Sequence, residues 1–341
     1  MKFKRRTVLT GLVGFSIPLI ASSCASGSSD TTASQASPSA SSEASSSTAG
    51  GAVRIGYQKA TELDLLRTRG ELDKKLKEQG ATVEWSLFPA GPPMLEAMNA
   101  GKIDFGGVGD APPIFSQAAG GQFYYVSTTP LSPETQDIVV PKDSPIQTPA
   151  DLKGKKVALQ KGSSAHYLLL KTLEEANIPA DQVEVIPLSP ADARAAFEQG
   201  NVDAWSIWDP FLAVAQKNGN IRGLNVGRER RVYFLASQQF TKNQPVLLKA
   251  VLEGAKENGD WVSNNIQEVA QRFSKDIKVD QDVLEEVYRR RSWKVEPIDA
   301  EIQTAQQEVA DIFYKSKIIP KSLQVREAFL PAEDYSKVFP S

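Results

Sequence analysis

The sequence predicts an α/β fold of two similar lobes, each a mostly parallel sheet flanked by helices, with a ligand cleft between the lobes. Three observations lead to this fold class. Short apolar strands alternate with helical segments, an internal repeat relates two parts of the chain, and the first 50 residues lack the pattern of a folded domain. With 341 residues and 41% apolar content, the chain is long enough for more than one hydrophobic core.

The alternation of strands and helices begins soon after residue 50. Val53–Tyr57 is a short apolar strand, and residues 62–79 have helical spacing. Residues 82–88 alternate with the period of a strand, residues 92–99 are helical, and residues 103–108 return to strand. The pattern continues with a strand at 137–140, a helix start near Pro149, a strand at 156–159, a helix at 164–176 and a helix-rich region at 244–316. Strands separated by helices of this length indicate a mostly parallel sheet.

An internal repeat indicates that the two lobes are alike. The segment that begins at Met94 aligns with the segment that begins at Ala193, and an upstream Gln-Lys pair aligns in the same order. The aligned pairs are Gly101 with Gly200, Asp104 with Asp203, Asp110 with Asp209, and Gln58 with Gln160. We expect residues 52–139 plus 236–341 to form lobe 1 and residues 140–235 to form lobe 2. The chain should then cross between the lobes near 138–140 and 234–237.

The N-terminus has the features of an export signal. Four basic residues precede an apolar run of 13 residues, Val8–Ile20, which is shorter than the roughly 20 residues of a membrane span. We therefore expect residues 1–23 to be a signal peptide, and the paired Arg5 and Arg6 leave open whether export follows the general or the twin-arginine route. Cys24, the only cysteine, follows three small residues and is the expected site of lipidation. The alternative is an ordinary signal peptide followed by an incidental cysteine.

The composition of residues 24–51 predicts a flexible tether. The segment is rich in serine and alanine and has no aromatic or large aliphatic side chain. Such a composition buries too little apolar area to offset its conformational entropy, so we expect a disordered, lipid-anchored linker on the periplasmic side of the cell membrane.

The composition favours binding over catalysis. The chain has 41 acidic and 39 basic residues, and loss of the basic signal peptide leaves the mature chain acidic. This balance argues against a nucleic-acid partner. One cysteine and one histidine exclude a disulfide framework, a cysteine-based zinc site and most histidine-dependent catalysis, so we expect no catalytic residues, metal or cofactor.

Four loops should meet in the cleft, because ligands of open α/β sheets bind beyond the carboxyl ends of the strands. They are residues 58–61, 109–112, 160–164 and 208–210. In the third loop Gly162, Ser163 and Ser164 follow a strand and open a helix, a place where backbone N–H groups, hydroxyls and the helix dipole favour an anion. The alternative is ordinary serine N-capping.

Acidic and aromatic residues complete the expected cleft. Asp110 and Asp209 are expected to cap helices, because a bare carboxylate would repel an anion. We expect Trp205 to pack in the core and Trp208, beside the loop, to contact an organic ligand tail.

Much of the chain resembles the aliphatic sulfonate-binding proteins of ABC importers, whose wider group also binds taurine, nitrate and bicarbonate. The resemblance covers nearly all of residues 53–335, and its most specific strings are QKGSS, GDAPPIF and QGNVDAWSIWDP. It implies a two-lobed type II periplasmic binding fold, without enzymatic activity, that delivers a sulfonate to a permease with a cytoplasmic ATPase for sulfur acquisition. By motif, the sulfonate would meet Gln58, Gly109, Asp110, Ala111, Ser163 and Ser164, with Trp208 and Asp209 on the opposing lobe. We expect a monomer.

The resemblance leaves several questions open. Arg289, Arg290 and Arg291 stand where relatives usually carry a shorter basic stretch; they could rim the cleft or form a solvated basic face. The ligand could instead be taurine, nitrate or another oxyanion, and the protein could be a sensory lipoprotein that does not transport. Related enzymes that make a thiamine-pyrimidine precursor depend on histidine, whereas His166 is alone and expected on the surface.

Overall fold

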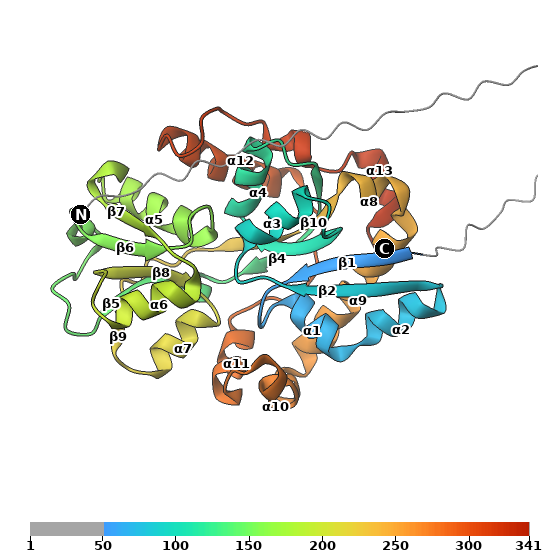
Figure 1. The fold of residues 1–341 in the computed structure, drawn as a ribbon, viewed down its shortest axis with the longest axis horizontal. Coiled ribbons are helices and arrows are strands. Elements are labelled where there is room, and N and C mark those ends of the chain that lie inside the picture. Colours follow the sequence, from blue (N-terminus) through green and yellow to red (C-terminus); the bar gives the residue numbers. More distant parts are fainter. Residues whose placement is uncertain (1–50, 341) are drawn as a thin grey trace, which may run out of the picture. The chain divides into compact units, whose positions relative to one another are not determined.

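A computed structural model describes residues 51–340 of the chain (Figure 1). The expected signal peptide, Cys24 and nearly all of the tether lie outside the described residues. Within residues 51–340, none of the helices combines the length and the apolarity needed to cross a bilayer.

The folded part contains two mixed five-stranded sheets. The first has the order β2-β1-β3-β10-β4 and the second the order β7-β6-β8-β5-β9. The strands of the first sheet are β1 (Gly51–Tyr57), β2 (Ala81–Leu87), β3 (Phe105–Gly109), β4 (Phe123–Leu131) and β10 (Arg230–Ser237). Those of the second are β5 (Gln136–Pro141), β6 (Lys156–Leu159), β7 (Glu184–Pro187), β8 (Ala204–Trp208) and β9 (Ile221–Gly223).

The two sheets share one topology, in agreement with the repeat. In each sheet three neighbouring strands are parallel, and the fourth in order is antiparallel to both of its neighbours. The repeated aspartates also have the same role. Asp104 Oδ2 accepts a hydrogen bond from Arg54 N at 3.0 Å, and Asp203 Oδ2 accepts one from Lys156 N at 2.7 Å.

Each antiparallel strand comes from a part of the chain that has just crossed between the lobes. β5 follows β4 of the first sheet, and β10 follows β9 of the second. The crossings are therefore residues 132–135 and 224–229. The expected crossings at 138–140 and 234–237 are wrong, because those residues are paired within β5 and β10; the lobe boundaries shift accordingly.

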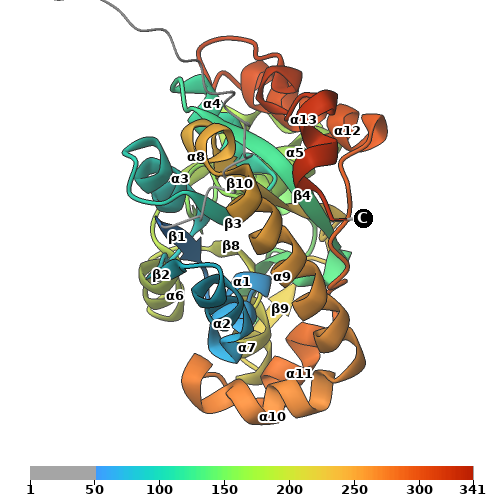
Figure 2. The ribbon, with the colours of Figure 1, turned by 90° about the vertical axis from the view of Figure 1, so that its right-hand side faces the viewer.

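Helices cover both faces of the first sheet (Figures 1 and 2). Apolar side chains of α1 (Glu62–Arg69), α2 (Glu71–Glu78) and α9 (Pro245–Asn264) pack on one face. Those of α3 (Gly91–Asn99), α4 (Ala111–Ala118) and α12 (Ala300–Lys315) pack on the other. The single helix expected over 62–79 is two helices, because Gly70 adopts φ +75° and ends α1.

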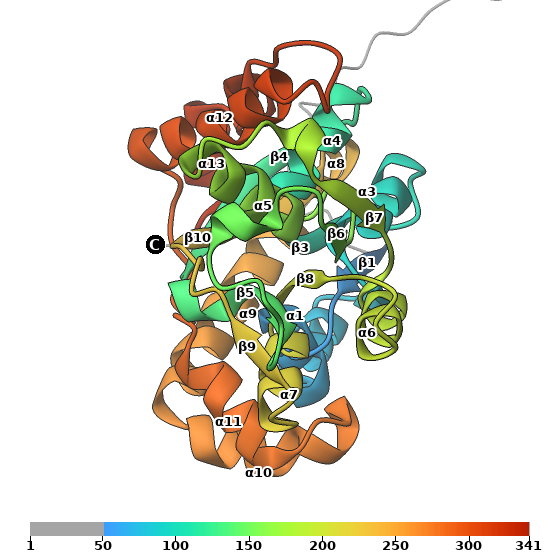
Figure 3. The same cartoon turned by 90° about the vertical axis from the view of Figure 1, so that its left-hand side faces the viewer.

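The second sheet is covered by α5 (Ser164–Glu175) on one face and by α6 (Pro190–Glu198) and α7 (Phe211–Lys217) on the other (Figure 3). The helix start expected near Pro149 is a short 3₁₀ turn, η2 (Pro149–Leu152). Trp205 is 1% exposed in this core, as expected. The remaining elements are α8 (Gln238–Asn243), α10 (Ile266–Ile277), α11 (Gln281–Arg289), α13 (Ala332–Val338) and the 3₁₀ turns η1 (Pro133–Thr135), η3 (Ala180–Gln182) and η4 (Val325–Ala328).

Helices of the two lobes also contact each other, in addition to the crossings. Ala213 of α7 belongs to an apolar cluster whose other members come mainly from α9, α10 and α11 of lobe 1. Beside it, Lys217 of α7 pairs with Asp280 and Asp282 at 3.0 and 2.7 Å. At another place α5 meets α12, where Lys315 Nζ lies 2.6 Å from Glu174 Oε1.

Candidate ligand-binding site

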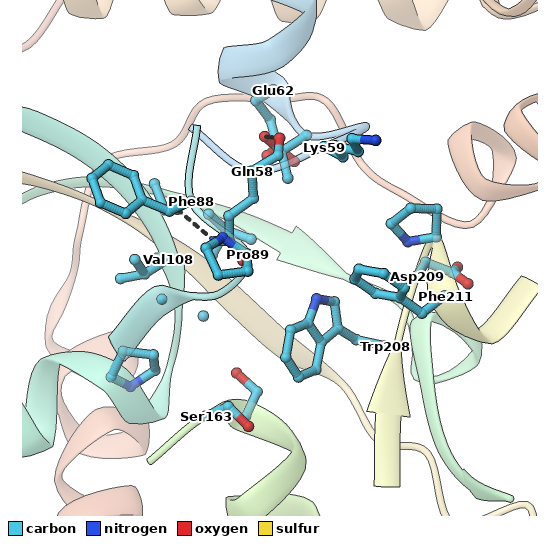
Figure 4. Close-up of a pocket in the computed structure, with 18 of the residues that line it drawn as sticks. Gln58, Lys59, Glu62, Phe88, Pro89, Val108, Ser163, Trp208, Asp209 and Phe211 are labelled. Atoms are coloured by element: carbon cyan, nitrogen blue, oxygen red, sulfur yellow. Dashed lines mark hydrogen bonds between the residues drawn. The ribbon is translucent and has the colours of Figure 1, made fainter. Parts of the chain in front are cut away.

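A pocket of about 350 Å³ lies where the ends of the strands in both sheets meet (Figure 4). This volume lies in the range of small-molecule sites. Each strand end supplies a loop, because the carboxyl ends of parallel strands meet at the same edge of a sheet. The lining includes Gln58 after β1, Phe88 after β2, Gly109 at the end of β3, Ser163 after β6 and Trp208 at the end of β8.

Six of the eight ligand-contacting residues expected from sequence line this pocket: Gln58, Gly109, Ser163, Ser164, Trp208 and Asp209. Asp110 and Ala111 do not line it, because they are buried at the start of α4, 4% and 0% exposed, while Pro112 faces the space. Asp110 Oδ1 accepts a hydrogen bond from Ala111 N at 2.8 Å, which confirms its expected capping role. Ligand contact by these residues stays a prediction.

The serine loop is shaped by its own hydrogen bonds. Ser163 is the N-cap of the 12-residue helix α5 without a side-chain cap bond, since its hydroxyl donates to Gln160 O at 2.7 Å. Gly162 has φ +75°, a left-handed conformation that glycine adopts without strain. The start of α5 therefore faces the pocket with its dipole and two serine hydroxyls.

Gly109 marks the point where three segments come closest. A Cβ at this position would lie 2.0 Å from Ser164 Oγ and 3.3 Å from Arg230 Nη1. Only glycine leaves room for both groups. The absence of a side chain on β3 thus lets a hydroxyl from lobe 2 and a guanidinium from β10 converge at one place.

Two arginines that sequence reasoning did not assign to the site also line the pocket. Arg230 is the first residue of β10, and its burial lowers the pKa of the guanidinium to about 10, an effect that Asp110 partly offsets. The group therefore stays protonated at neutral pH. Arg291 has a side chain only 5% exposed, donates to Ala60 O at 2.9 Å and lies 3.7 Å from Glu62 Oε1. The one signal in the sequence was the basic character of the runs ERR and RRR.

The arginine run at 289–291 is divided between solvent and interior. Arg289 is exposed and pairs with Glu285 one turn earlier on α11, which fits a solvated face. Arg290 is 15% exposed, and Arg291 lines the pocket. The expectation of a solvated basic face therefore holds for Arg289 alone.

Two carboxylates balance part of this positive charge. Lys59, Arg230 and Arg291 line the pocket together with Glu62 and Asp209. Burial raises the pKa of Asp209 to about 6, while Arg290, Arg291 and Arg230 oppose that rise. Asp209 Oδ1 accepts a hydrogen bond from Ala213 N at 3.1 Å, as expected for a capping residue. Its own N–H donates to Thr135 O at 2.9 Å and is not directed at a ligand.

Comparisons with known proteins identify the family of the chain. The profile of the family described as NMT1/THI5 like matches residues 77–268. An Escherichia coli (strain K12) protein, named provisionally as an aliphatic sulfonates-binding protein, is 39% identical over 281 residues, which cover 81% of this chain and 88% of the relative. The chain belongs to the NMT1/THI5-like family.

Solved structures agree with this family assignment. The alkanesulfonate-binding protein SsuA from Xanthomonas axonopodis pv. citri, bound to MOPS, superposes with a TM-score of 0.78 and is 36% identical, covering 82% of this chain and 98% of that one. The periplasmic aliphatic sulphonate binding protein SsuA from Escherichia coli gives 0.72 and 37%, covering 82% and 92%. Both support the periplasmic binding protein fold expected from the sequence.

A similar fold is also found in an enzyme. The 2'-hydroxybiphenyl-2-sulfinate desulfinase of Rhodococcus erythropolis is 23% identical over 302 residues, which cover 64% of this chain and 82% of the enzyme. A likeness at this level shows the shared fold alone.

Apolar side chains also line this pocket. Phe88, Val108, Pro112, Trp208 and Phe211 contribute to it, and Trp208 and Phe211 meet edge to face with ring centroids 6.3 Å apart. Trp208 lines the pocket, and its contact with an organic ligand tail stays a prediction. A pocket lined by both cationic donors and aromatic surface suits an amphipathic anion.

His166, expected at the surface, is 2% exposed. Its ring lies 5.4 Å from the ring of Phe313 and 6.3 Å from that of Phe115, so the helix turn that carries it faces lobe 1 and not solvent. Nδ1 accepts a hydrogen bond from Gly162 N at 3.2 Å, and burial lowers the pKa of the imidazole to about 4. The neutral imidazole of His166 therefore supports the serine loop by accepting this hydrogen bond.

Proposed function

We propose that the protein is the aliphatic sulfonate-binding component of an ABC transporter. The observation that carries the proposal is the pocket between the lobes, which is lined by two guanidinium groups, two serine residues and several aromatic side chains. The family supports it, since relatives more than 35% identical over most of both chains are named for sulfonate binding.

A sulfonate fits the donor side of this pocket. The group is ionised throughout the physiological pH range, so its partners need not exchange a proton with it. Arg230, Arg291 and the Ser164 hydroxyl replace its water shell, together with the dipole of α5 and with the Ser163 hydroxyl once its proton turns from Gln160 O to the ligand. Each charge-assisted hydrogen bond contributes about 1.5–3 kcal/mol.

The organic tail lies against the aromatic side chains of the pocket in this proposal. Burying an apolar tail contributes about 0.8 kcal/mol for each CH₂ group, so affinity rises with chain length until the tail reaches solvent. Leu87, at the edge of the pocket, is 50% exposed and marks where that happens. Gln58, which the resemblance assigns to the ligand, also lines the pocket, and its amide nitrogen donates to Gly107 O at 3.2 Å.

The protein binds and releases its ligand unchanged in this proposal. It acts as a monomer on the periplasmic side of the membrane and passes the sulfonate to the permease, which a cytoplasmic ATPase drives for sulfur acquisition. Opening about the crossings at residues 132–135 and 224–229 would admit the ligand, and closure would exclude water from it.

Membrane attachment through Cys24 is part of the same proposal. Residues 1–23 are the signal peptide and residues 24–51 the lipid-anchored tether. Palmitate labelling of whole cells should mark the protein and not its Cys24→Ser variant. Equal labelling of both would contradict the anchor.

Calorimetric titration of the full chain tests the ligand class. We expect Ser163→Ala combined with Ser164→Ala to weaken alkanesulfonate binding at least tenfold, because both hydroxyls of the serine loop are lost from the pocket. Unchanged affinity would contradict the role of the serine loop. Titration of taurine, nitrate and a series of alkanesulfonates ranks the alternative ligands. A gene neighbourhood without a permease and an ATPase would favour a sensory lipoprotein.

A further inference from the structure

Arg290 links the lobes through a residue of the pocket without lining the pocket itself. It follows α11 directly, and its Nη1 lies 3.4 and 3.5 Å from the two carboxylate oxygens of Asp209 in lobe 2. Its Nη2 donates to Gln216 Oε1 of α7 at 2.9 Å and pairs with Glu286. The proposed function makes no use of this residue.

Asp209 lines the pocket, but its carboxylate oxygens lie against Arg290. The residue is 3% exposed, and Ala213 N donates to Oδ1 at 3.1 Å. In Figure 4 the carboxylate oxygens lie on the side of the residue that faces away from Trp208. Two interactions, one from α7 and one from lobe 1, therefore hold the negative charge outside the aromatic part of the pocket.

We propose that Arg290 is a positioning residue that determines specificity: by holding the carboxylate of Asp209 behind the pocket wall and neutralising it, Arg290 lets the pocket accept plain sulfonates and disfavours sulfonates that carry an ammonium group. This inference rests on the proposed sulfonate-binding function and names the subclass of sulfonate that the site selects.

Elementary electrostatics gives the reason. A carboxylate at the edge of a buried site repels an anionic ligand and attracts a cationic group on it. The charges that face Asp209 are Arg290 behind it and Arg291 and Arg230 in the pocket. Glu62 lies beside Arg291, and Glu286 shares Arg290. Without Arg290, Asp209 would lose the cation that hydrogen-bonds to it, and its carboxylate would be free to turn toward the ligand.

The test compares ethanesulfonate with taurine, which differ by one ammonium group. In calorimetry at pH 8, we expect Arg290→Gln to weaken ethanesulfonate binding at least tenfold and to raise the ratio of taurine to ethanesulfonate affinity at least tenfold. Arg289→Gln, the adjacent exposed arginine, should leave both affinities within twofold of the wild type. Arg290→Lys, which keeps the charge, should retain most of the preference for ethanesulfonate.

The pH profile and a double variant separate positioning from a merely structural role. Burial has raised the pKa of Asp209 to about 6 with Arg290 present, and removal of a cation raises it further. As the pH falls to 5 the carboxyl takes up a proton, so ethanesulfonate affinity of Arg290→Gln should recover. Asp209→Asn combined with Arg290→Gln should restore ethanesulfonate binding at pH 8. It should also return the ratio of taurine to ethanesulfonate affinity to that of the wild type.

Several results would overturn the proposal. One is that Arg290→Gln behaves like Arg289→Gln while the wild type binds ethanesulfonate; another is that the double variant does not recover binding. If the melting temperature shows that Arg290→Gln does not fold, Arg290→Met decides in its place: a rise of at least tenfold in the ratio of taurine to ethanesulfonate affinity supports the proposal, and an unchanged ratio contradicts it. A wild type that binds no sulfonate would instead overturn the proposed function, and this inference with it.

Discussion

His166 shows how a single side chain links the stability of the lobe contact to the shape of the serine loop. Its ring fills the space between Phe115 and Phe313, and its Nδ1 accepts the hydrogen bond from Gly162 N. Both roles require a neutral imidazole. Protonation would place a charge in an apolar contact and remove the acceptor.

The stability of the protein should therefore depend on pH through His166. Its pKa is about 4 in the folded state against 6.5 when exposed, so the unfolded chain takes up a proton first as the pH falls. The stabilisation is fully present above pH 6.5 and is lost as the pH falls toward 4, by up to about 3 kcal/mol. We expect urea unfolding at pH 7, 5.5 and 4 to show this loss in the wild type relative to His166→Gln, whose amide still offers an acceptor. Parallel pH profiles of the two proteins would refute it.

At the scale of elements, helix α9 depends on two glycines with different surroundings. A Cβ at Gly259 would lie 2.0 Å from the carbonyl oxygen of Trp293, which is backbone and cannot rotate away. A Cβ at Gly254 would lie 3.1 Å from Leu72 Cδ1, the end of a flexible side chain. Gly259 thus allows the segment after α11, which carries Arg291 into the pocket, to pack directly on α9.

Alanine at these two positions should have opposite effects. Glycine to alanine in a helix interior contributes about 1 kcal/mol of intrinsic stability. We expect Gly254→Ala to be neutral or stabilising, and Gly259→Ala to lower the free energy of unfolding by about 2–3 kcal/mol because the backbone at Trp293 must move. Chemical denaturation of the two variants makes a matched comparison. A stable Gly259→Ala would mean that the segment moves freely.

The elements that sequence patterns predicted are those with local signals. β6 was expected at 156–159 and lies there, and the four expected cleft loops supply ten of the 21 residues that line the pocket. Strand β10 was partly assigned to a crossing, because its apolar run gives no sign that it would enter the first sheet antiparallel. Arg230 was not expected in the pocket, and the role of Arg291 was left open, for a related reason: their place in the pocket depends on how β10 and the segment after α11 pack, which no local pattern encodes.

At the scale of the whole molecule, the pocket belongs to neither lobe alone. Gly109 and Arg291 come from lobe 1, and Ser164 and Trp208 come from lobe 2. Arg230 begins β10, the strand of the first sheet that follows the second crossing. A bound anion therefore bridges two separate hydrophobic cores. Its binding free energy stabilises their closed arrangement, by about 2.7 kcal/mol at a ligand concentration one hundred times Kd.

Hydrogen exchange should report this bridging. With saturating alkanesulfonate, we expect slower amide exchange in peptides of both lobes, around residues 107–112 and around residues 160–166 and 206–211, because both ends of the pocket are held together. The Ser163→Ala, Ser164→Ala variant at the same ligand concentration is the control and should show less protection. Protection confined to one lobe would mean that the ligand binds one wall only.

The contact between α7 and α11 has a practical consequence. It places Lys217 of one lobe beside Asp280 and Asp282 of the other at exposed positions. Cys24 is the only cysteine in the chain and lies outside residues 51–340, so its replacement would leave the protein without any thiol. Thiol-reactive dyes at positions 217 and 282 would then turn separation of the lobes into a change in fluorescence. The same two helices could thereby serve as the optical element of a sulfonate sensor.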